Sequence, residues 1–313
     1  MHTLKLGSNP QDIETAAQIL SQGGLVAFPT ETVFGLGAHA CDDTAVAKIY
    51  QAKGRPSFNP LIVHVATIEM VARYVHWTDQ ARQIADAFWP GPLTMVLPVR
   101  ADAGLSDLVR AGLPTVAIRV PRHTVAQQLL HRFSGPIAAP SANPSGKISP
   151  TRAEHVLSGL DGRIDAILQD GHSEDGVEST ILHFDPNPTI LRPGTITAAQ
   201  IEQVLGCPIT QLEQADNIIA PGQMTSHYAP RGHVRLNATH WKSGEKRLGF
   251  GAVACDLNLS PNGDLAEAAA NLFAMLHEID ALRGDQIAIS PIPNHGIGVA
   301  INDRLKRAAA PRD

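Results

Sequence analysis

The chain has 313 residues, of which 43% are hydrophobic and 18% are charged, and its formal net charge is −5. A chain of this length can bury a large core, and at about 150 residues per domain it suggests two domains. The acidic balance argues against a broad electrostatic surface for nucleic acid, which usually needs a surplus of Lys and Arg. Any anion site therefore has to be local.

The first elements alternate between helix and strand. Segment 9–20 predicts a helix, because Asn9 can cap its N-terminus, Pro10 fits the first turn and Gly23-Gly24 ends it. The short apolar run 25–28 predicts a buried strand. Further strands are expected at 61–65, 94–99, 116–120, 137–139, 166–169 and 180–184, and further helices at 44–52, 79–88, 123–133, 152–159 and 198–205. This order predicts a mixed α/β layer fold with one twisted sheet and without regular Rossmann alternation.

The remaining third predicts a linker and a second domain. Residues 208–230 lose periodicity and collect Pro, Gln, Asn and Gly, as linkers do. After them, strands are expected at 247–255 and 286–292, and helices at 265–282 and 298–309. We therefore expect a first domain over 1–207, a linker over 208–230 and a small α/β domain over 231–313. The run GFGAVA from Gly249 matches GxGxxA in letters, but a loop-like stretch follows it, which argues against a nicotinamide site.

An anion site is indicated where the first apolar strand ends. Thr30 and Thr32 follow that strand, and open α/β sheets bind ligands just beyond such strand ends. Two glycines, Gly35 and Gly37, are expected to turn the backbone and let it approach a ligand closely. Helix 44–52 then delivers a pair of cations, Lys53 and Arg55. Taken alone, a turn followed by solvated cations explains this stretch equally well.

Several other chemistries lack their motifs. Residues 1–15 have neither the charged nor the apolar region of a signal peptide, and no apolar run approaches the roughly 18 residues of a membrane span, so a cytoplasmic protein is expected. Three scattered cysteines, Cys41, Cys207 and Cys255, lack CxxC spacing, which argues against a disulfide framework or a zinc site. We expect them to be inert thiols. Gly146-Lys147 lacks the residues of a P-loop, and Ser141 lacks the GxSxG elbow of a hydrolase.

Seven motifs in order resemble one family. They are PTETVFGLGAHA, KGRPSFNPLIVHV, WPGPLT, TVAIRVP, APSANPSGKISPT, EST and ILRPG, and APGQMTSHYAP follows them. This set resembles the YrdC-like threonylcarbamoyl-AMP synthases in their long, two-domain form, over about residues 3–309. The resemblance implies a YrdC-like twisted mixed-sheet domain with a ligand cleft and a small C-terminal Rossmann-like α/β domain.

The resemblance also implies a reaction and its partners. Members of this family condense L-threonine, bicarbonate and ATP into threonylcarbamoyl-adenylate and release pyrophosphate. The product is passed to a tRNA threonylcarbamoyl-transferase complex, which makes N6-threonylcarbamoyladenosine at position 37, and a weak contact with tRNA itself is possible. Nucleotidyl transfer needs charge stabilisation and alignment more than a covalent catalyst, so cations and fixed donors suffice.

Each residue that matches a family motif has an implied role. Lys53 and Arg55 are implied to be catalytic by neutralising the triphosphate. The implied ATP-binding residues are Lys53, Arg55, Asn59, Thr115, Ser141, Asn143, Thr151, Arg192 and Tyr228. The implied threonine-binding residues are Thr32, His64, Arg119, Ser179 and Thr180, with Arg119 as the clamp of the carboxylate. Taken singly, a structural ion pair or an ordinary turn explains each of these motifs.

The sequence departs from the family pattern at two places, and the resemblance also bears on the metal and on the alternative functions. Phe34 stands where the family usually has Tyr, and Asp170-Gly171-His172 where it commonly has Asp-Gly-Gly. Mg²⁺ is expected to arrive with ATP, without metal-ligating residues or a tightly bound cofactor. The alternatives are a non-catalytic RNA-binding module of the same fold, a hydrogenase-maturation carbamoyltransferase and a structural partner protein.

Segment 220–230 is expected to do more than connect the domains. Met224, His227 and Tyr228 have apolar bodies with polar tips, unlike the Gly and Ser of flexible linkers. The hypothesis is a lid over the first domain, with Tyr228 on the nucleotide. A rigid strap packed on the outside is the alternative.

Overall fold

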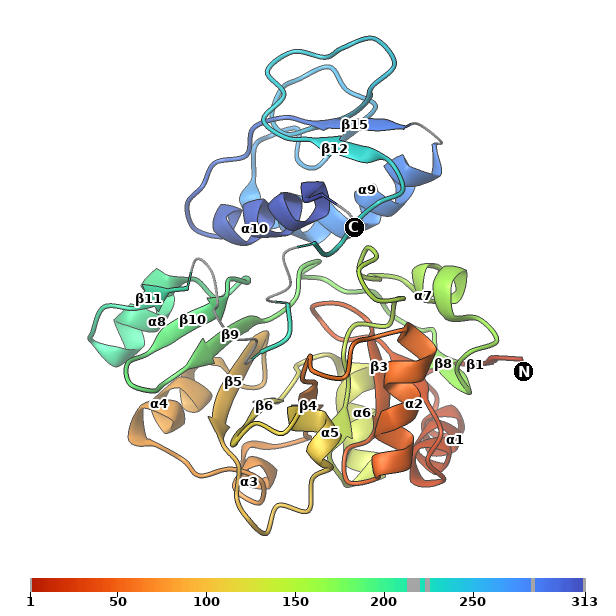
Figure 1. Cartoon of the computed structure of the whole chain (residues 1–313), viewed down its shortest axis with the longest axis vertical. Coiled ribbons are helices and arrows are strands. Elements are labelled where there is room, and N and C mark those ends of the chain that lie inside the picture. Colours follow the sequence, from red (N-terminus) through yellow and green to blue (C-terminus); the bar gives the residue numbers. More distant parts are fainter. Residues whose placement is uncertain (1, 213–219, 223–225, 283–284, 312–313) are drawn as a thin grey trace.

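The computed structural model describes residues 2–212, 220–222, 226–282 and 285–311. Figure 1 shows a larger body formed by the first part of the chain and a smaller body formed by its last part. The two long helices of the smaller body lie between its sheet and the larger body (Figure 1). These helices therefore form the side of the smaller body that meets the larger one.

A mixed sheet organises the larger body. Its described strands are β1 (Leu4–Leu6), β2 (Val26–Phe28), β3 (Gly35–His39), β4 (Ile62–His64), β5 (Leu93–Pro98), β6 (Thr115–Arg119), β7 (Ile137–Ala138), β8 (Ala166–Leu168), β9 (Thr180–His183), β10 (Thr189–Arg192) and β11 (Thr210–Gln211). Their order is β1-β8-β2-β3-β7-β4-β6-β5-β9-β10-β11. Because β4 pairs parallel with β6 whereas β2 and β3 are antiparallel, the expected mixed sheet is confirmed.

Helices cover both faces of this sheet. They are α1 (Pro10–Ser21), α2 (Asp43–Lys53), α3 (Ile68–Val71), α4 (Asp79–Phe88), α5 (Asp107–Arg110), α6 (Thr124–Phe133), α7 (Ala153–Leu160) and α8 (Ala198–Leu205). Side chains of β2 alternate between the faces. Phe28 packs with the buried residues of α1 and α6, whereas Ala27 belongs to the cluster of α2 and α4.

The smaller body has a parallel sheet and two helices. Its strands β12 (His233–Arg235), β13 (Lys246–Gly249), β14 (Leu257–Asn258) and β15 (Gln286–Ile289) lie in the order β12-β15-β13-β14. All three pairings are parallel. The helices are α9 (Leu265–Ala281) and α10 (Gly298–Ala309).

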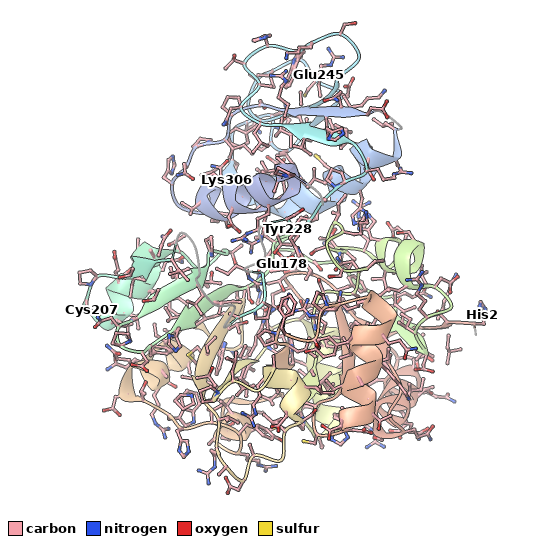
Figure 2. The ribbon with its side chains drawn as sticks, viewed as in Figure 1. His2, Glu178, Cys207, Tyr228, Glu245 and Lys306 are labelled. Carbon is pink, nitrogen blue, oxygen red and sulfur yellow. The ribbon has the colours of Figure 1, made fainter. Side chains whose placement is uncertain are left out.

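The cores of the two bodies meet. Val33, Ile148 and Val177 of the larger body belong to the same buried cluster as Phe273 of α9. Tyr228 joins this cluster, with its ring centroid 5.3 Å from that of Phe273. Figure 2 places Tyr228 at this junction. The smaller body is thus packed against the larger one through a shared cluster of buried apolar side chains.

The structure corrects the expected turn at Gly35 and Gly37. Both residues lie within β3, where Gly37 pairs with Val26, and neither has a positive φ. A Cβ at Gly37 would lie 2.8 Å from the Phe28 ring and 2.9 Å from the Ile137 side chain. This glycine therefore makes room for core packing, and the reversal of the chain occurs in residues 29–34.

A second correction concerns the strand expected at 247–255. The observed strand β13 ends at Gly249, because Gly251 has a φ of +77° and the chain turns there. The stretch expected to be a loop contains the two-residue strand β14. None of the helices in the described residues combines the length and the hydropathy that crossing a membrane requires.

Candidate functional site

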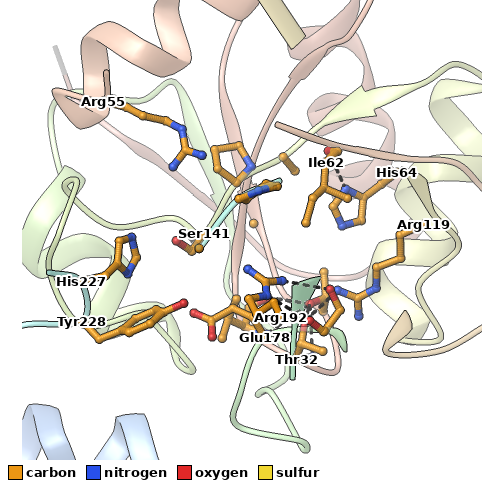
Figure 3. Close-up of a pocket in the computed structure, with 18 residues that line it drawn as sticks. Thr32, Arg55, Ile62, His64, Arg119, Ser141, Glu178, Arg192, His227 and Tyr228 are labelled. Atoms are coloured by element: carbon orange, nitrogen blue, oxygen red, sulfur yellow. Dashed lines mark hydrogen bonds between the residues drawn. The ribbon is translucent and has the colours of Figure 1, made fainter. Parts of the chain in front are cut away.

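A cavity with an empty volume of about 530 Å³ lies over the centre of the large sheet. Its described lining residues are Thr30, Thr32, Val33, Gly35, Arg55, Ile62, His64, Arg119, Ala139, Pro140, Ser141, Glu178, Ser179, Arg192, Pro221, Gly222, His227 and Tyr228. Figure 3 shows Arg119 and His64 on one side of the cavity, and Arg55, His227 and Tyr228 on the other.

The Arg119 side of the cavity is built by neighbouring strands. Arg119 ends β6 and pairs in register with His64 of β4. The Arg119 guanidinium donates from Nε to Gly91 O at 3.2 Å and from Nη1 to Thr32 Oγ1 at 2.8 Å. Thr32 is itself 2.9 Å from the Thr30 hydroxyl, which donates to Val33 O. The structure thus brings three predicted threonine residues together: Thr32, His64 and Arg119.

A buried carboxylate that the sequence analysis did not select holds Arg119. Glu31 Oε1 lies 2.7 Å from Arg119 Nη2, and both side chains are almost fully buried. Burial alone raises the pKa of Glu31, but the charge and hydrogen bond of Arg119 and the backbone hydrogen bonds to the carboxylate together lower the pKa below the usual value. Glu31 thus neutralises and orients the Arg119 guanidinium, which lines the cavity.

His64 is neutral in this setting. Burial and then the positive charge of Arg119 lower the pKa of His64 to about 3. Its Nδ1 lies 3.2 Å from Ile62 O. If Nδ1 carries the proton in that contact, Nε2 is left as an acceptor.

The other two predicted threonine residues differ in position. Ser179 lines the cavity and its hydroxyl lies 2.7 Å from Thr94 Oγ1. Thr180 does not line the cavity: its hydroxyl donates to Ile196 O at 2.7 Å. The structure therefore brings Ser179, but not the Thr180 side chain, to the cavity.

Two arginines bring positive charge to the cavity. Arg55 follows α2 and donates to Asn59 O at 3.2 Å and to Pro60 O at 2.9 Å. Burial lowers its pKa to about 10, so Arg55 is charged at neutral pH. Arg192 ends β10 and donates to Ser179 O and Ser179 Oγ, each at 3.1 Å. These bonds fix both guanidinium groups before any ligand arrives.

Lys53 is placed differently from the two arginines. It does not line the cavity, and its ammonium donates to Ser141 O at 2.5 Å and to Asn143 O. Burial and then the charge of Arg55 lower the pKa of Lys53 well below the usual value. In this structure Lys53 ties α2 to the loop at 141–143.

The remaining predicted ATP residues lie at varying distances from the cavity. Ser141 lines it. Asn143 and Thr151 are buried and do not line this cavity, and Asn143 Oδ1 and Thr151 Oγ1 have no hydrogen-bond partner among the described residues. Asn59 is buried and contributes its carbonyl to Arg55. Thr115 begins β6, at the opposite end of that strand from Arg119, and does not line the cavity.

Residues of the expected linker form one wall. His227 and Tyr228 are buried and line the cavity, together with Pro221 and Gly222. Burial, together with the negative charge of Glu178, raises the pKa of Tyr228 to about 12, so its hydroxyl keeps its proton. Burial lowers the pKa of His227 to about 3. Met224, named in the lid hypothesis, lies outside the described residues.

Two family models match the chain. The Sua5, YciO and YrdC model, described as "Telomere recombination", matches residues 18–194, and the model described as "Threonylcarbamoyl-AMP synthase, C-terminal domain" matches residues 196–310. The threonylcarbamoyl-AMP synthase of Bacillus subtilis is 42% identical over 99% of this chain and 96% of its own length. The chain belongs to the threonylcarbamoyl-AMP synthase family.

Relatives from an archaeon agree with this assignment. The threonylcarbamoyl-AMP synthase of Pyrococcus abyssi is 38% identical over 96% of this chain and 94% of its own length. A crystal structure of P. abyssi Sua5 complexed with L-threonine matches with a TM-score of 0.90 and 36% identity, covering 99% of this chain and 98% of that chain. The two-domain form of the threonylcarbamoyl-AMP synthase family therefore accounts for both bodies of the structure.

Membership of the threonylcarbamoyl-AMP synthase family confirms the resemblance drawn from the seven motifs and makes the chain a nucleotidyltransferase. The match of the second model to residues 196–310 favours this family over a hydrogenase-maturation carbamoyltransferase and over a non-catalytic RNA-binding module.

Two residues of the site were not among the predicted ones, and a third was predicted only as part of the lid segment. Glu31 and Glu178 stand within the motifs PTET and EST but were passed over in favour of their neighbours, whereas His227 of SHYAP was named with the lid and given no role in binding. Glu31 holds Arg119, whereas Glu178 and His227 line the cavity. The signal that could have found the two glutamates is an acidic residue inside a motif expected to bind anions, since such a charge needs a partner.

Proposed function

We propose that this chain forms threonylcarbamoyl-AMP and pyrophosphate from L-threonine, bicarbonate and ATP, for the synthesis of N6-threonylcarbamoyladenosine in tRNA. The amine of threonine becomes a carbamate, a carbamate oxygen attacks the α-phosphate of ATP, and pyrophosphate leaves. The observation that carries the proposal is one cavity lined by three guanidinium groups, that of Arg119 on one side together with those of Arg55 and Arg192. The substrates must lie side by side for the attack to occur.

We assign the Arg119 side to threonine. The Arg119 guanidinium would bind the carboxylate, with Thr32, His64 and the Ser179 hydroxyl around the rest of the amino acid. Thr180 would act by holding Ser179 at the cavity, because its own hydroxyl is bonded to Ile196 O and its N–H to Pro92 O. Since the His64 ring is neutral, it can accept a hydrogen bond from a substrate group without adding charge to the pocket.

We assign the opposite side to ATP. Arg55 and Arg192 would bind the phosphates, Ser141 and Tyr228 would contact the nucleotide from facing walls, and Lys53 would act by holding the 141–143 loop. The other proposed nucleotide contacts are Asn59, Thr115, Asn143 and Thr151. Two unpartnered buried oxygens, on Asn143 and Thr151, support such a role, because a buried acceptor without a partner is costly.

Mg²⁺ is proposed as the companion of ATP. Among the described residues, no three His, Cys, Asp or Glu side chains converge on a point that could hold a metal ion. Glu178 is the acidic residue among the described lining residues, and both its oxygens already have partners. These observations fit an ion held mainly by phosphate oxygens and water, the usual arrangement for Mg²⁺ with nucleotides.

The domain boundaries and the setting are likewise proposals. We place the catalytic domain at 1–207, the linker at 208–230 and the second domain, with a Rossmann-like α/β arrangement, at 231–313. A cytoplasmic location and transfer of the product to a tRNA-modifying complex follow from the proposed reaction, because an acyl adenylate hydrolyses unless another enzyme receives it.

The reaction is tested by pyrophosphate release. We expect release only when ATP, bicarbonate and L-threonine are all present, and we expect the adenylate to be detectable by mass spectrometry. Omission of bicarbonate and replacement of threonine by other amino acids serve as controls. Pyrophosphate release that does not depend on an amino acid would contradict the proposed reaction.

Segment 208–230 is proposed as a lid over the nucleotide. Pro221, Gly222, His227 and Tyr228 line the cavity, which supports closure by this segment. We expect ATP and threonine together to slow proteinase K cleavage within 208–230, as followed by mass spectrometry. Cleavage near Val253, which is 41% exposed and far along the chain from this segment, serves as the control. Equal cleavage of 208–230 with and without substrates would favour the rigid strap.

A further inference from the structure

A carboxylate lines the side of the cavity that is assigned to anionic phosphates. Glu178 is 6% exposed and lies among the residues around Arg192 and Tyr228. In Figure 3 its carboxylate points toward the Tyr228 hydroxyl. Burial alone raises the pKa of Glu178, but the charges of Arg304 and then Arg192 outweigh burial and lower the pKa. Glu178 is therefore a negative charge in the wall of a site for negative ligands.

The cation that balances Glu178 comes from the second domain. Arg304 of α10 donates from Nε to Glu178 Oε2 at 2.7 Å, and its Nη2 lies 3.4 Å from Glu178 O. Ser149 donates to the other carboxylate oxygen, Oε1, at 2.5 Å. Arg304 is fully buried. It lies 126 residues from Glu178 in the sequence. The pair thus joins the two domains at the cavity wall.

Arg304 is held in place on its other sides. Its Nη1 lies 2.7 Å from Asp303 Oδ2, and its guanidinium carbon lies 5.6 Å from the centre of the Tyr228 ring. Burial alone lowers the pKa of Arg304, but Tyr228, Glu178 and Asp303 together raise it. The residue is therefore permanently charged, and its position is fixed relative to both Glu178 and Tyr228.

The Glu178 carboxylate and the phosphates of ATP can both attract the Arg192 guanidinium. Ser179, which follows Glu178 directly, accepts hydrogen bonds from Arg192 at both its carbonyl and its hydroxyl. The two charges also attract each other, since Arg192 contributes to the lowered pKa of Glu178. An ionised Glu178 without Arg304 would draw the Arg192 guanidinium to itself, because an unpaired buried charge is costly. Arg192 would then be withdrawn from the phosphates.

We propose that Arg304 is a positioning residue through which the second domain occupies Glu178, so that Arg192 and Arg55 remain available to the phosphates of ATP. The inference rests on the proposed function, because it concerns the same nucleotide site. It assigns the second domain a direct electrostatic role in nucleotide affinity, in addition to the apolar contacts at the junction. Arg304 itself does not line the cavity.

The test compares three variants of the full chain with the wild type. Arg304→Met removes the charge and keeps an apolar side chain of similar length, Arg304→Met with Glu178→Gln removes both charges, and Lys306→Met removes an exposed charge from the same helix. Equilibrium affinity for ATP with Mg²⁺ and for L-threonine is measured by calorimetry, and KM for each substrate by pyrophosphate release.

We expect Arg304→Met to weaken ATP binding by about tenfold or more, as when one partner of a buried charge pair is removed, and to leave threonine binding unchanged. The double variant should recover most of the lost ATP affinity, because Glu178 no longer competes for Arg192. Lys306→Met should behave as the wild type. Wild-type ATP affinity in Arg304→Met, or a double variant as weak as the single one, overturns the proposal and leaves Arg304 as an interdomain tie.

Two further measurements keep the test decisive. If Arg304→Met does not fold, Glu178→Gln alone is measured. It should bind ATP at least as tightly as the wild type, because Arg192 then has no competing carboxylate, and a weaker affinity overturns the proposal. The calorimetric measurement of ATP affinity does not require the enzyme to turn over. A wild type that binds ATP but releases no pyrophosphate with threonine and bicarbonate therefore removes the proposed reaction and not the role of Arg304.

Discussion

Arg55→Ala is expected to lower the rate of adenylate formation by about two to three orders of magnitude, the usual effect of removing one fixed donor to developing charge. Arg55 lines the cavity and is held by the carbonyls of Asn59 and Pro60. Its guanidinium is therefore in place before ATP binds. The rate is measured as pyrophosphate release at saturating threonine and bicarbonate.

The control for this substitution is Arg73→Ala, which removes an exposed arginine from the same domain. It should leave the rate unchanged. Calorimetric binding of threonine should survive in Arg55→Ala, because the Arg119 side of the cavity does not depend on Arg55. If Arg55→Ala releases pyrophosphate at the wild-type rate, Arg55 does not bind the phosphates of ATP.

Arg55→Lys separates charge from geometry. Lysine is a point charge that cannot bond both carbonyls and a phosphate oxygen in one plane, as the fork of arginine can. We therefore expect an activity between those of the wild type and Arg55→Ala.

The helices were the part of the fold most open to prediction, because their ends carry local signals. Helices α4 and α8 have the predicted bounds, and a threonine caps each of them: Thr78 bonds the N–H of Ala81, and Thr197 forms a capping box with Gln200. Such caps depend on residues within one turn, so sequence alone reveals them.

The missed strands lacked a local signal. Strand β3 contains two glycines, which usually weaken a strand, and it is stabilised by pairing with β2 and β7. Strand β1 has three residues and exists through its pairing with β8, about 160 residues later in the chain. Both strands depend on partners that are distant in sequence, which a local pattern cannot show.

The same limit applies to the site. The motifs selected Arg119, Arg55 and Arg192, and the structure brings all three to one cavity. The motifs gave Lys53 the same role because its charge is the same, yet its ammonium faces carbonyls of the 141–143 loop. The direction of a side chain depends on what surrounds it in space, and the sequence of one segment does not contain that information.

Arg119→Lys is expected to raise the KM for threonine by about tenfold or more and to change the KM for ATP much less. Arg119 bonds Gly91 O and Thr32 Oγ1 and pairs with Glu31, so its guanidinium is held at the cavity wall before threonine binds. A lysine ammonium cannot serve all of these directions. Loss of one charge-assisted bond, worth about 1.5 to 3 kcal/mol, corresponds to a tenfold or larger change.

Arg122→Lys is the matched control for this last substitution. Arg122 is three residues away, is half exposed and pairs with Asp175, and its side chain does not line the cavity. Both KM values should stay near those of the wild type. Thermal unfolding of Arg119→Lys is measured alongside, because Glu31 is buried and its carboxylate needs a cation. If the folded Arg119→Lys variant shows equal increases in both KM values, Arg119 does not bind the threonine carboxylate, and the two ends of the cavity have to be reassigned.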